Sequence, residues 1–172
     1  MESTTRYHNA KKDIYYTPDE ALQLLLPFLR SVKSIWDPAA GANKRYPLKT
    51  FFESRGKRVI PTDICEGEEF NFMTFKTRKR FDAIVTTPPY NMRKEFILRC
   101  YELDKPFALI CPINVLESKL VRNAFKSSPV SIVFPPKNIS FMLPDNTQLK
   151  NPIPYSVFII KGIPGIPPVK YL

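Results

Sequence analysis

An apolar run passes directly into a turn of small residues in the segment Val32-Lys33-Ser34-Ile35-Trp36-Asp37-Pro38-Ala39-Ala40-Gly41. The run up to Trp36 predicts a short buried β-strand that ends where Asp37-Pro38 begins the turn. A helix is expected next, with Pro47 near its start and Gly56 just past its end. Small side chains let a ligand approach the backbone, although an ordinary tight turn is the alternative. The dinucleotide pattern G-x-G-x-x-G is absent, which argues against a nicotinamide dehydrogenase.

Strand and helix patterns alternate on both sides of this segment. Further strands are expected at 58–64, 81–86, 107–111, 130–134 and 155–160, and helices at 17–29 (capped by Thr17), 48–54, 95–103 and 115–125. The segment 70–75 is ambiguous. Alternating strands and helices predict an α/β fold with a mostly parallel sheet covered on both faces. Only a proline-broken loop, 135–154, joins the last two strands, so they can form an antiparallel hairpin at one edge.

Length and composition indicate one globular domain. We expect an arm at 1–12, the domain at 13–162 and a proline-rich tail at 163–172. No apolar run reaches the roughly 20 residues that cross a bilayer, and the polar N-terminus does not resemble a signal peptide. The three cysteines lack the spacing of a zinc site and are expected to be free thiols, mostly buried. These features predict an intracellular protein in a reducing compartment, cytoplasmic if the source is bacterial or phage.

The chain is strongly basic. It contains 26 Lys and Arg against 16 Asp and Glu, a net charge of +10. Such a balance favours a polyanionic partner, nucleic acid above all, and a solubilising surface is the alternative. His8 is the only histidine, so a mechanism that needs a histidine base is not expected.

Four segments follow predicted strands, at 37–43, 63–64, 87–90 and 112–114. In open α/β sheets, ligands bind at the carboxyl ends of the strands. Asp63 can bind the two hydroxyls of a ribose there, or simply cap a helix or a turn. The sharpest signal is Thr87-Pro88-Pro89-Tyr90, because two prolines remove backbone donors and leave carbonyls and an aromatic ring at the same edge.

These residues together resemble a known family. From about Tyr15 to Gly162 the chain is similar to the class I S-adenosylmethionine-dependent methyltransferases that modify the N6 amine of adenine, in particular the minimal phage-type DNA methylases. Asp37 to Gly41 resembles the D-P-x-x-G loop, and Thr87 to Tyr90 resembles the catalytic tetrapeptide [DNS]-P-P-[YF]. The resemblance implies a Rossmann-like sheet of seven strands and S-adenosyl-L-methionine as cofactor, with no metal.

The resemblance also implies roles for individual residues. Thr87, Pro88, Pro89 and Tyr90 would be catalytic: the first two would accept hydrogen bonds from the target amine, and Tyr90 would stack on the extruded base. The residues expected at the cofactor are Tyr16, Thr17, Pro18, Asp37, Ala39, Ala40, Gly41, Asp63, Ile64, Asn71 and Phe72. Glu69 competes with Asn71-Phe72 for the place near the adenine of the cofactor.

Two positions depart from the family pattern. The loop reads Gly41-Ala42-Asn43 rather than G-x-G, and Thr87 stands where the family has Asp, Asn or Ser. A degenerate, nucleic-acid-binding relative and a protein-glutamine methyltransferase therefore remain as alternatives to the adenine methyltransferase.

Basic and polar side chains at the same edge are the expected nucleic-acid contacts. They are Lys44, Arg45, Arg93, Lys94, Lys137 and Asn138. The chain has little room for a separate target-recognition domain, so specificity would come from the loop 135–154, a homodimer or a specificity subunit. The basic cluster at 76–80 precedes its strand and is expected at the opposite edge.

Overall fold

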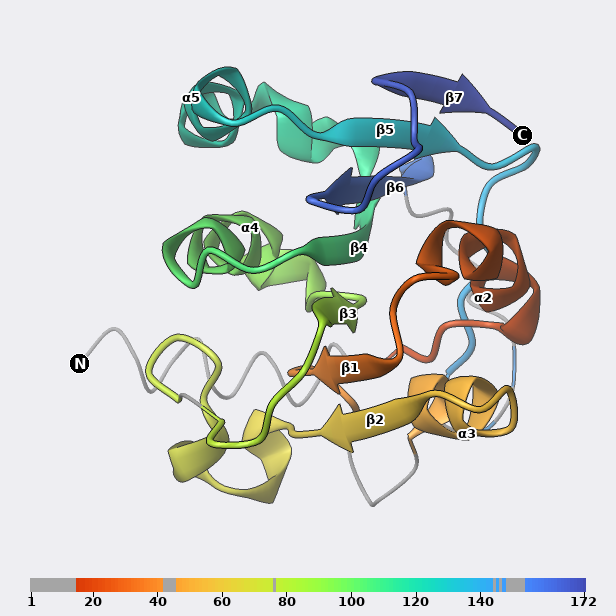
Figure 1. The fold of residues 1–172 in the computed structure, drawn as a ribbon, viewed down its shortest axis with the longest axis vertical. Helices are drawn as coiled ribbons and strands as arrows, with labels where there is room; N and C mark the ends of the chain where they lie inside the picture. Colours follow the sequence, from red (N-terminus) through yellow and green to blue (C-terminus); the bar gives the residue numbers. More distant parts are fainter. Residues whose placement is uncertain (1–14, 42–45, 76, 144, 146, 148–153) are drawn as a thin grey trace.

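A seven-stranded sheet forms the centre of the protein in a computed structural model (Figure 1). The structure describes residues 15–41, 46–75, 77–143, 145, 147 and 154–172. The strands follow the order β2-β1-β3-β4-β6-β5-β7 across the sheet. Their bounds are β1 Ser34–Asp37, β2 Arg58–Pro61, β3 Ala83–Thr86, β4 Phe107–Pro112, β5 Ser131–Phe134, β6 Ser156–Lys161 and β7 Val169–Tyr171.

Strand direction divides the sheet into two parts. The pairs β1–β2, β1–β3 and β3–β4 are parallel, whereas β6 runs antiparallel to both β4 and β5. The predicted pairing of the last two strands is therefore confirmed. The segment expected as a proline-rich tail contributes a further strand, because β7 pairs in parallel with β5.

Helices cover both faces of the sheet. α2 Asp19–Leu25 and α3 Pro47–Glu53 lie on one face, and α4 Arg93–Glu102 and α5 Lys119–Ser127 lie on the other (Figure 1). The described residues also form five short 3-10 helices: η1 Leu26–Leu29, η2 Ile64–Glu66, η3 Glu68–Phe70, η4 Tyr90–Met92 and η5 Ile113–Glu117. The ambiguous segment 70–75 is thus a turn region, not a regular element.

Alternation along each strand creates two separate cores. Ile35 packs with the residues of α2 and α3, and its neighbour Trp36 packs with those of α4 and α5. Both side chains are almost completely buried. A sheet that is covered on both faces buries successive residues of its strands, and β1, β3 and β4 are buried along their whole length.

Two local predictions were wrong. Thr17 does not cap α2, because Pro18 occupies the cap position in an extended conformation and no side chain caps the helix. The single helix expected at 115–125 is two elements, η5 and α5. The chain becomes extended at Ser118, whose side chain accepts a hydrogen bond from the Val121 N–H and starts the second helix.

The cysteines are free, and Cys100 and Cys111 are buried, as expected for thiols in apolar segments. Burial raises the pKa of both thiols, that of Cys111 to about 12. Among the described residues, no helix is both long enough and apolar enough to span a bilayer.

Candidate cofactor and catalytic site

Asp37 is a fully buried carboxylate at the carboxyl end of β1. Its Oδ1 accepts a hydrogen bond from Thr86 Oγ1 at 2.6 Å and a longer one from the Ala39 N–H at 3.3 Å. Its Oδ2 is buried and has no partner. Burial raises the pKa of Asp37 to about 7, although the bond from Thr86 opposes the shift. A buried carboxylate with one unsatisfied oxygen is suited to a cationic or hydrogen-bond-donating ligand.

The turn after Asp37 is joined by hydrogen bonds to the residues that follow β2. Gly41 has φ of +104°, a conformation that favours glycine. Its N–H donates to Asp63 Oδ2 at 2.9 Å, and the Ala40 N–H donates to the Thr62 carbonyl at 3.1 Å. The loops after β1 and β2 therefore form one rigid unit.

Asp63 is the residue that joins these two loops. Its Oδ1 accepts from the Cys65 N–H at 2.8 Å and caps η2. Asp63 therefore makes the helix cap that was predicted as the alternative to ribose binding. A carboxylate has about four lone-pair sites, so the same group keeps acceptor capacity for a ribose. Ile64, the next residue, is half-buried at this edge.

Thr87 lies next to the N-terminal segment that precedes α2. The hydroxyls of Thr17 and Thr87 are 2.7 Å apart and form a hydrogen bond. The segment is fixed on its other side, because Tyr16 exchanges two backbone hydrogen bonds with Met142 at 2.8 and 2.9 Å. The structure thus brings the Tyr16-Thr17-Pro18 segment and the Thr87 tetrapeptide into contact.

Tyr90 is positioned by a neighbour one helical turn later. The guanidinium of Arg93 lies 4.4 Å from the centre of the Tyr90 ring, and it donates a hydrogen bond to the Tyr90 carbonyl. Arg93 Nε is buried and has no partner. Arg93 is thus half-buried and held against Tyr90, whereas a freely exposed side chain was expected for a phosphate contact.

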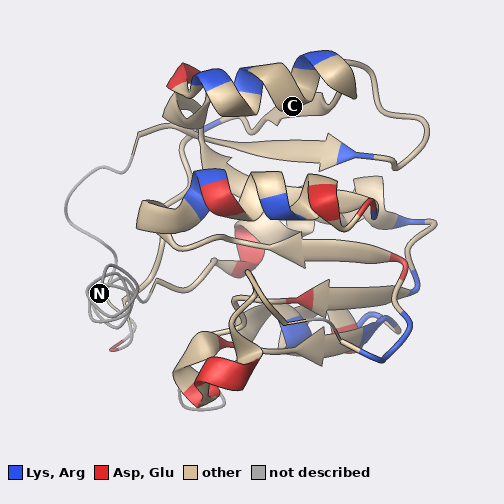
Figure 2. Ribbon diagram, turned by 90° about the vertical axis from the view of Figure 1, so that its left-hand side faces the viewer, with Lys and Arg blue, Asp and Glu red and all other residues tan. Residues whose placement is uncertain are grey.

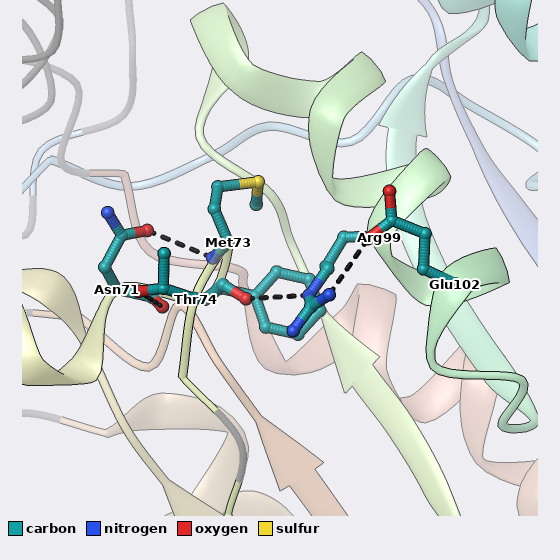
Figure 3. A network of polar contacts seen from close by, with 6 residues as sticks. Asn71, Met73, Thr74, Arg99 and Glu102 are labelled. Atoms are coloured by element: carbon teal, nitrogen blue, oxygen red, sulfur yellow. Dashed lines mark hydrogen bonds and ion pairs between the residues drawn. The ribbon is translucent and has the colours of Figure 1, made fainter.

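Asn71 is half-buried and Phe72 is buried, and both lie near α4. Asn71 Oδ1 accepts from the Met73 N–H at 3.0 Å, and the Phe72 carbonyl accepts from Arg99 Nε of α4 at 3.2 Å (Figure 3). The ring of Phe72 is 2% exposed and packs 5.2 Å from Trp36 and 4.7 Å from Phe96. In this arrangement Phe72 is part of the core on the α4 side.

The nucleic-acid candidates differ in their surroundings. Lys94 and Lys137 are exposed, and Arg93 is half-buried. Asn138 has a structural role, because its Oδ1 accepts from the Ser156 N–H at 3.0 Å and from the Ile139 N–H at 2.9 Å. Lys44 and Arg45 lie outside the described residues.

Charge is unevenly distributed over the described surface. Figure 2 shows basic residues along α5 and on the loop before β3, and acidic residues on the short helices after β2. The loop before β3 joins the amino end of that strand, so its basic residues 78–80 lie at the edge away from Asp37, as expected.

Sequence reasoning missed two polar residues of this edge, Thr86 and Ser156, and named Asn114 only as part of the segment 112–114. Thr86 binds Asp37, while Asn114 Oδ1 and Ser156 Oγ are buried without partners at the end of β4 and the start of β6. Ser156 pairs with Pro112 in the antiparallel register. The available signal was a polar residue beside an otherwise apolar strand, which local pattern cannot distinguish from a turn residue.

Comparison with known proteins agrees with this architecture. No protein-family model matches the chain. The chain is 24% identical over 107 residues to the type II methyltransferase M.EcoRI of Escherichia coli, an alignment that covers 58% of this chain and 33% of that protein. The chain therefore spans about a third of the length of its curated relative.

A solved structure from Listeria monocytogenes, described as a class I S-adenosylmethionine-dependent methyltransferase, superposes with a TM-score of 0.52 at 12% identity. The superposition covers 91% of this chain and 65% of the Listeria protein. The fold is the Rossmann-like fold of the class I methyltransferases, with a mostly parallel seven-stranded sheet and an antiparallel edge, as the sequence resemblance predicted.

Proposed function

We propose that this chain transfers a methyl group from S-adenosylmethionine to the exocyclic N6 amine of adenine in nucleic acid, with DNA preferred over RNA. One observation carries the proposal: hydrogen bonds join the expected cofactor segments to the expected catalytic tetrapeptide and to the residue directly before it. Thr86 binds Asp37 at 2.6 Å, and the next residue, Thr87, binds Thr17 at 2.7 Å. The sequence similarity to a type II methyltransferase supports the same reading.

The residues present fit the cofactor. Oδ2 of Asp37 is buried and has no partner, so it can accept a hydrogen bond from the amino group at the methionine end of the cofactor. Thr17, Pro18 and the backbone from Ala39 to Gly41 would lie around that end. Asp63 would bind the ribose, with Ile64, Asn71 and Phe72 toward the adenine. When bound, S-adenosylmethionine supplies a methyl group on a positively charged sulfur.

The tetrapeptide offers the hydrogen-bond acceptors that the target amine needs in order to react. The N6 amine is conjugated with the adenine ring and is a weak nucleophile. Thr87 Oγ1 and the Pro88 carbonyl can accept its two hydrogens and turn its lone pair toward the methyl group. That lone pair forms the N–C bond as the C–S bond breaks, and the nitrogen then loses a proton to solvent. Tyr90, braced by Arg93, offers a ring for the extruded base.

The net charge of +10 supports a polyanionic substrate. Lys94 and Lys137 are exposed and can contact phosphates, and Lys44 and Arg45 are proposed for the same role. Target choice would come from the loop 135–154, a second copy of the chain or a separate specificity subunit.

The decisive experiment incubates the protein with labelled S-adenosylmethionine and separate pools of DNA, RNA and protein. Mass spectrometry of the labelled product should identify N6-methyladenine in DNA. Thr87→Ala and Tyr90→Ala should each abolish most of the transfer, while Lys79→Ala at the opposite edge should not. Cofactor and DNA binding without transfer would instead indicate a degenerate binding subunit, and labelled glutamine in the protein pool would indicate a protein methyltransferase.

A further inference from the structure

The hydroxyl of Thr87 can help or hinder methyl transfer according to where its hydrogen points. Asp and Asn side chains always present a carbonyl or carboxylate oxygen as an acceptor, but a threonine hydroxyl is both donor and acceptor. A hydroxyl hydrogen directed at the target nitrogen would occupy the lone pair that must attack the methyl group. Thr87 therefore needs a partner that removes its hydrogen from the site.

Thr17 is placed to be that partner. Its Oγ1 lies 2.7 Å from Thr87 Oγ1, and its side chain is only 4% exposed, so water has little access to compete. The backbone of Thr17 is held on both sides. Tyr16 is paired with Met142, and Pro18 fixes the backbone on the other side in an extended conformation. Threonine is also β-branched, which restricts the rotation of its side chain.

We propose that Thr17 is a positioning residue for methyl transfer: it accepts the hydroxyl hydrogen of Thr87 and so leaves both lone pairs of Thr87 Oγ1 for the target amine. This inference rests on the proposed function. It explains how threonine can stand where an obligate acceptor would be expected.

A variant cycle separates positioning from simple packing or cofactor contact. Thr17→Val removes the hydroxyl and keeps the shape, and Thr17→Ser keeps the hydroxyl. Each is made in the natural chain and in a Thr87→Asn background, where the amide oxygen is an acceptor that needs no such partner. Transfer to adenine-containing DNA gives kcat and KM, calorimetry gives the affinity for S-adenosylmethionine, and thermal melting reports folding.

Thr17→Val should lower kcat about tenfold in the natural chain with little change in the KM for DNA, as loss of one orienting hydrogen bond would do. Thr17→Ser should stay within about threefold of the natural chain. In the Thr87→Asn background, Thr17→Val should change kcat by less than about threefold. Any change in cofactor affinity caused by Thr17→Val should be equal in the two backgrounds.

Equal losses of kcat in both backgrounds would overturn the inference and leave the proposed function intact, since Thr17 would then act through the cofactor or through packing. A natural chain that methylates no adenine in DNA, although it is folded, would overturn the proposed function and the inference with it.

Discussion

Raising the pH from 6 to 7.5 should tighten S-adenosylmethionine binding about eightfold, because the carboxyl of Asp37 loses its proton over this range. Burial raises the pKa of Asp37 to about 7. The amino group of the cofactor carries a positive charge, so it prefers the ionised carboxylate. If only that form binds, the apparent dissociation constant at pH 6 is about elevenfold above its limit, and at pH 7.5 only about 1.3-fold.

Two variants isolate this carboxyl group. Asp37→Asn cannot ionise, so its cofactor affinity should be weaker at neutral pH and flat from pH 6 to 7.5. Thr86→Val removes the 2.6 Å hydrogen bond that opposes the shift, so the midpoint of the pH profile should move upward. Isothermal titration calorimetry in buffers of matched ionic strength measures all three proteins. A pH-independent affinity in the natural chain, or the same slope in Asp37→Asn, would refute the reasoning.

Three further perturbations test the structure around the site. The pKa of Asp37 is raised from 3.8 to about 7. The contribution of this group to the free energy of unfolding is therefore fully present below the unfolded pKa of 3.8 and falls by about 4 kcal/mol as the pH rises to 7. Urea titrations of Asp37→Asn should show a correspondingly weaker loss of stability over that range. Thr62→Val should lower the free energy of unfolding by about 1–3 kcal/mol, because the buried Nε1 of Trp36 loses its acceptor at 2.9 Å; an unchanged urea midpoint would contradict this. Arg93→Lys should lower kcat more than it weakens DNA binding, since lysine keeps the charge but cannot lie flat against Tyr90; an equal loss in a DNA-binding assay would make Arg93 a phosphate contact instead.

Much of the architecture could be read from local pattern. The apolar runs that end at Trp36 and at Thr86 each predicted a strand of a mostly parallel sheet. The structure has both as strands, and it places these strands, β1 and β3, side by side. The loop 135–154 without helical pattern predicted the antiparallel pairing of β5 and β6. These features depend on periodicity and on the residues at strand ends, which are local properties of the chain.

Other elements could not be read in this way. β7 was missed because it has only three residues, all exposed, which is too short for a recognisable period. It is a strand through its pairing with β5. The break at Ser118 was missed because the apolar residues on either side continue a helical pattern across it.

The sequence by itself determined which segments lie at the carboxyl ends of the strands, because alternation of elements and strand ends are local. Only the tertiary structure decided which polar groups meet there. The bonds Thr86–Asp37 and Thr17–Thr87 join residues that are distant along the chain. Their formation depends on how neighbouring strands and the N-terminal segment are placed in space. The burial that raises the pKa of Asp37 likewise comes from everything packed around it, which no local pattern records.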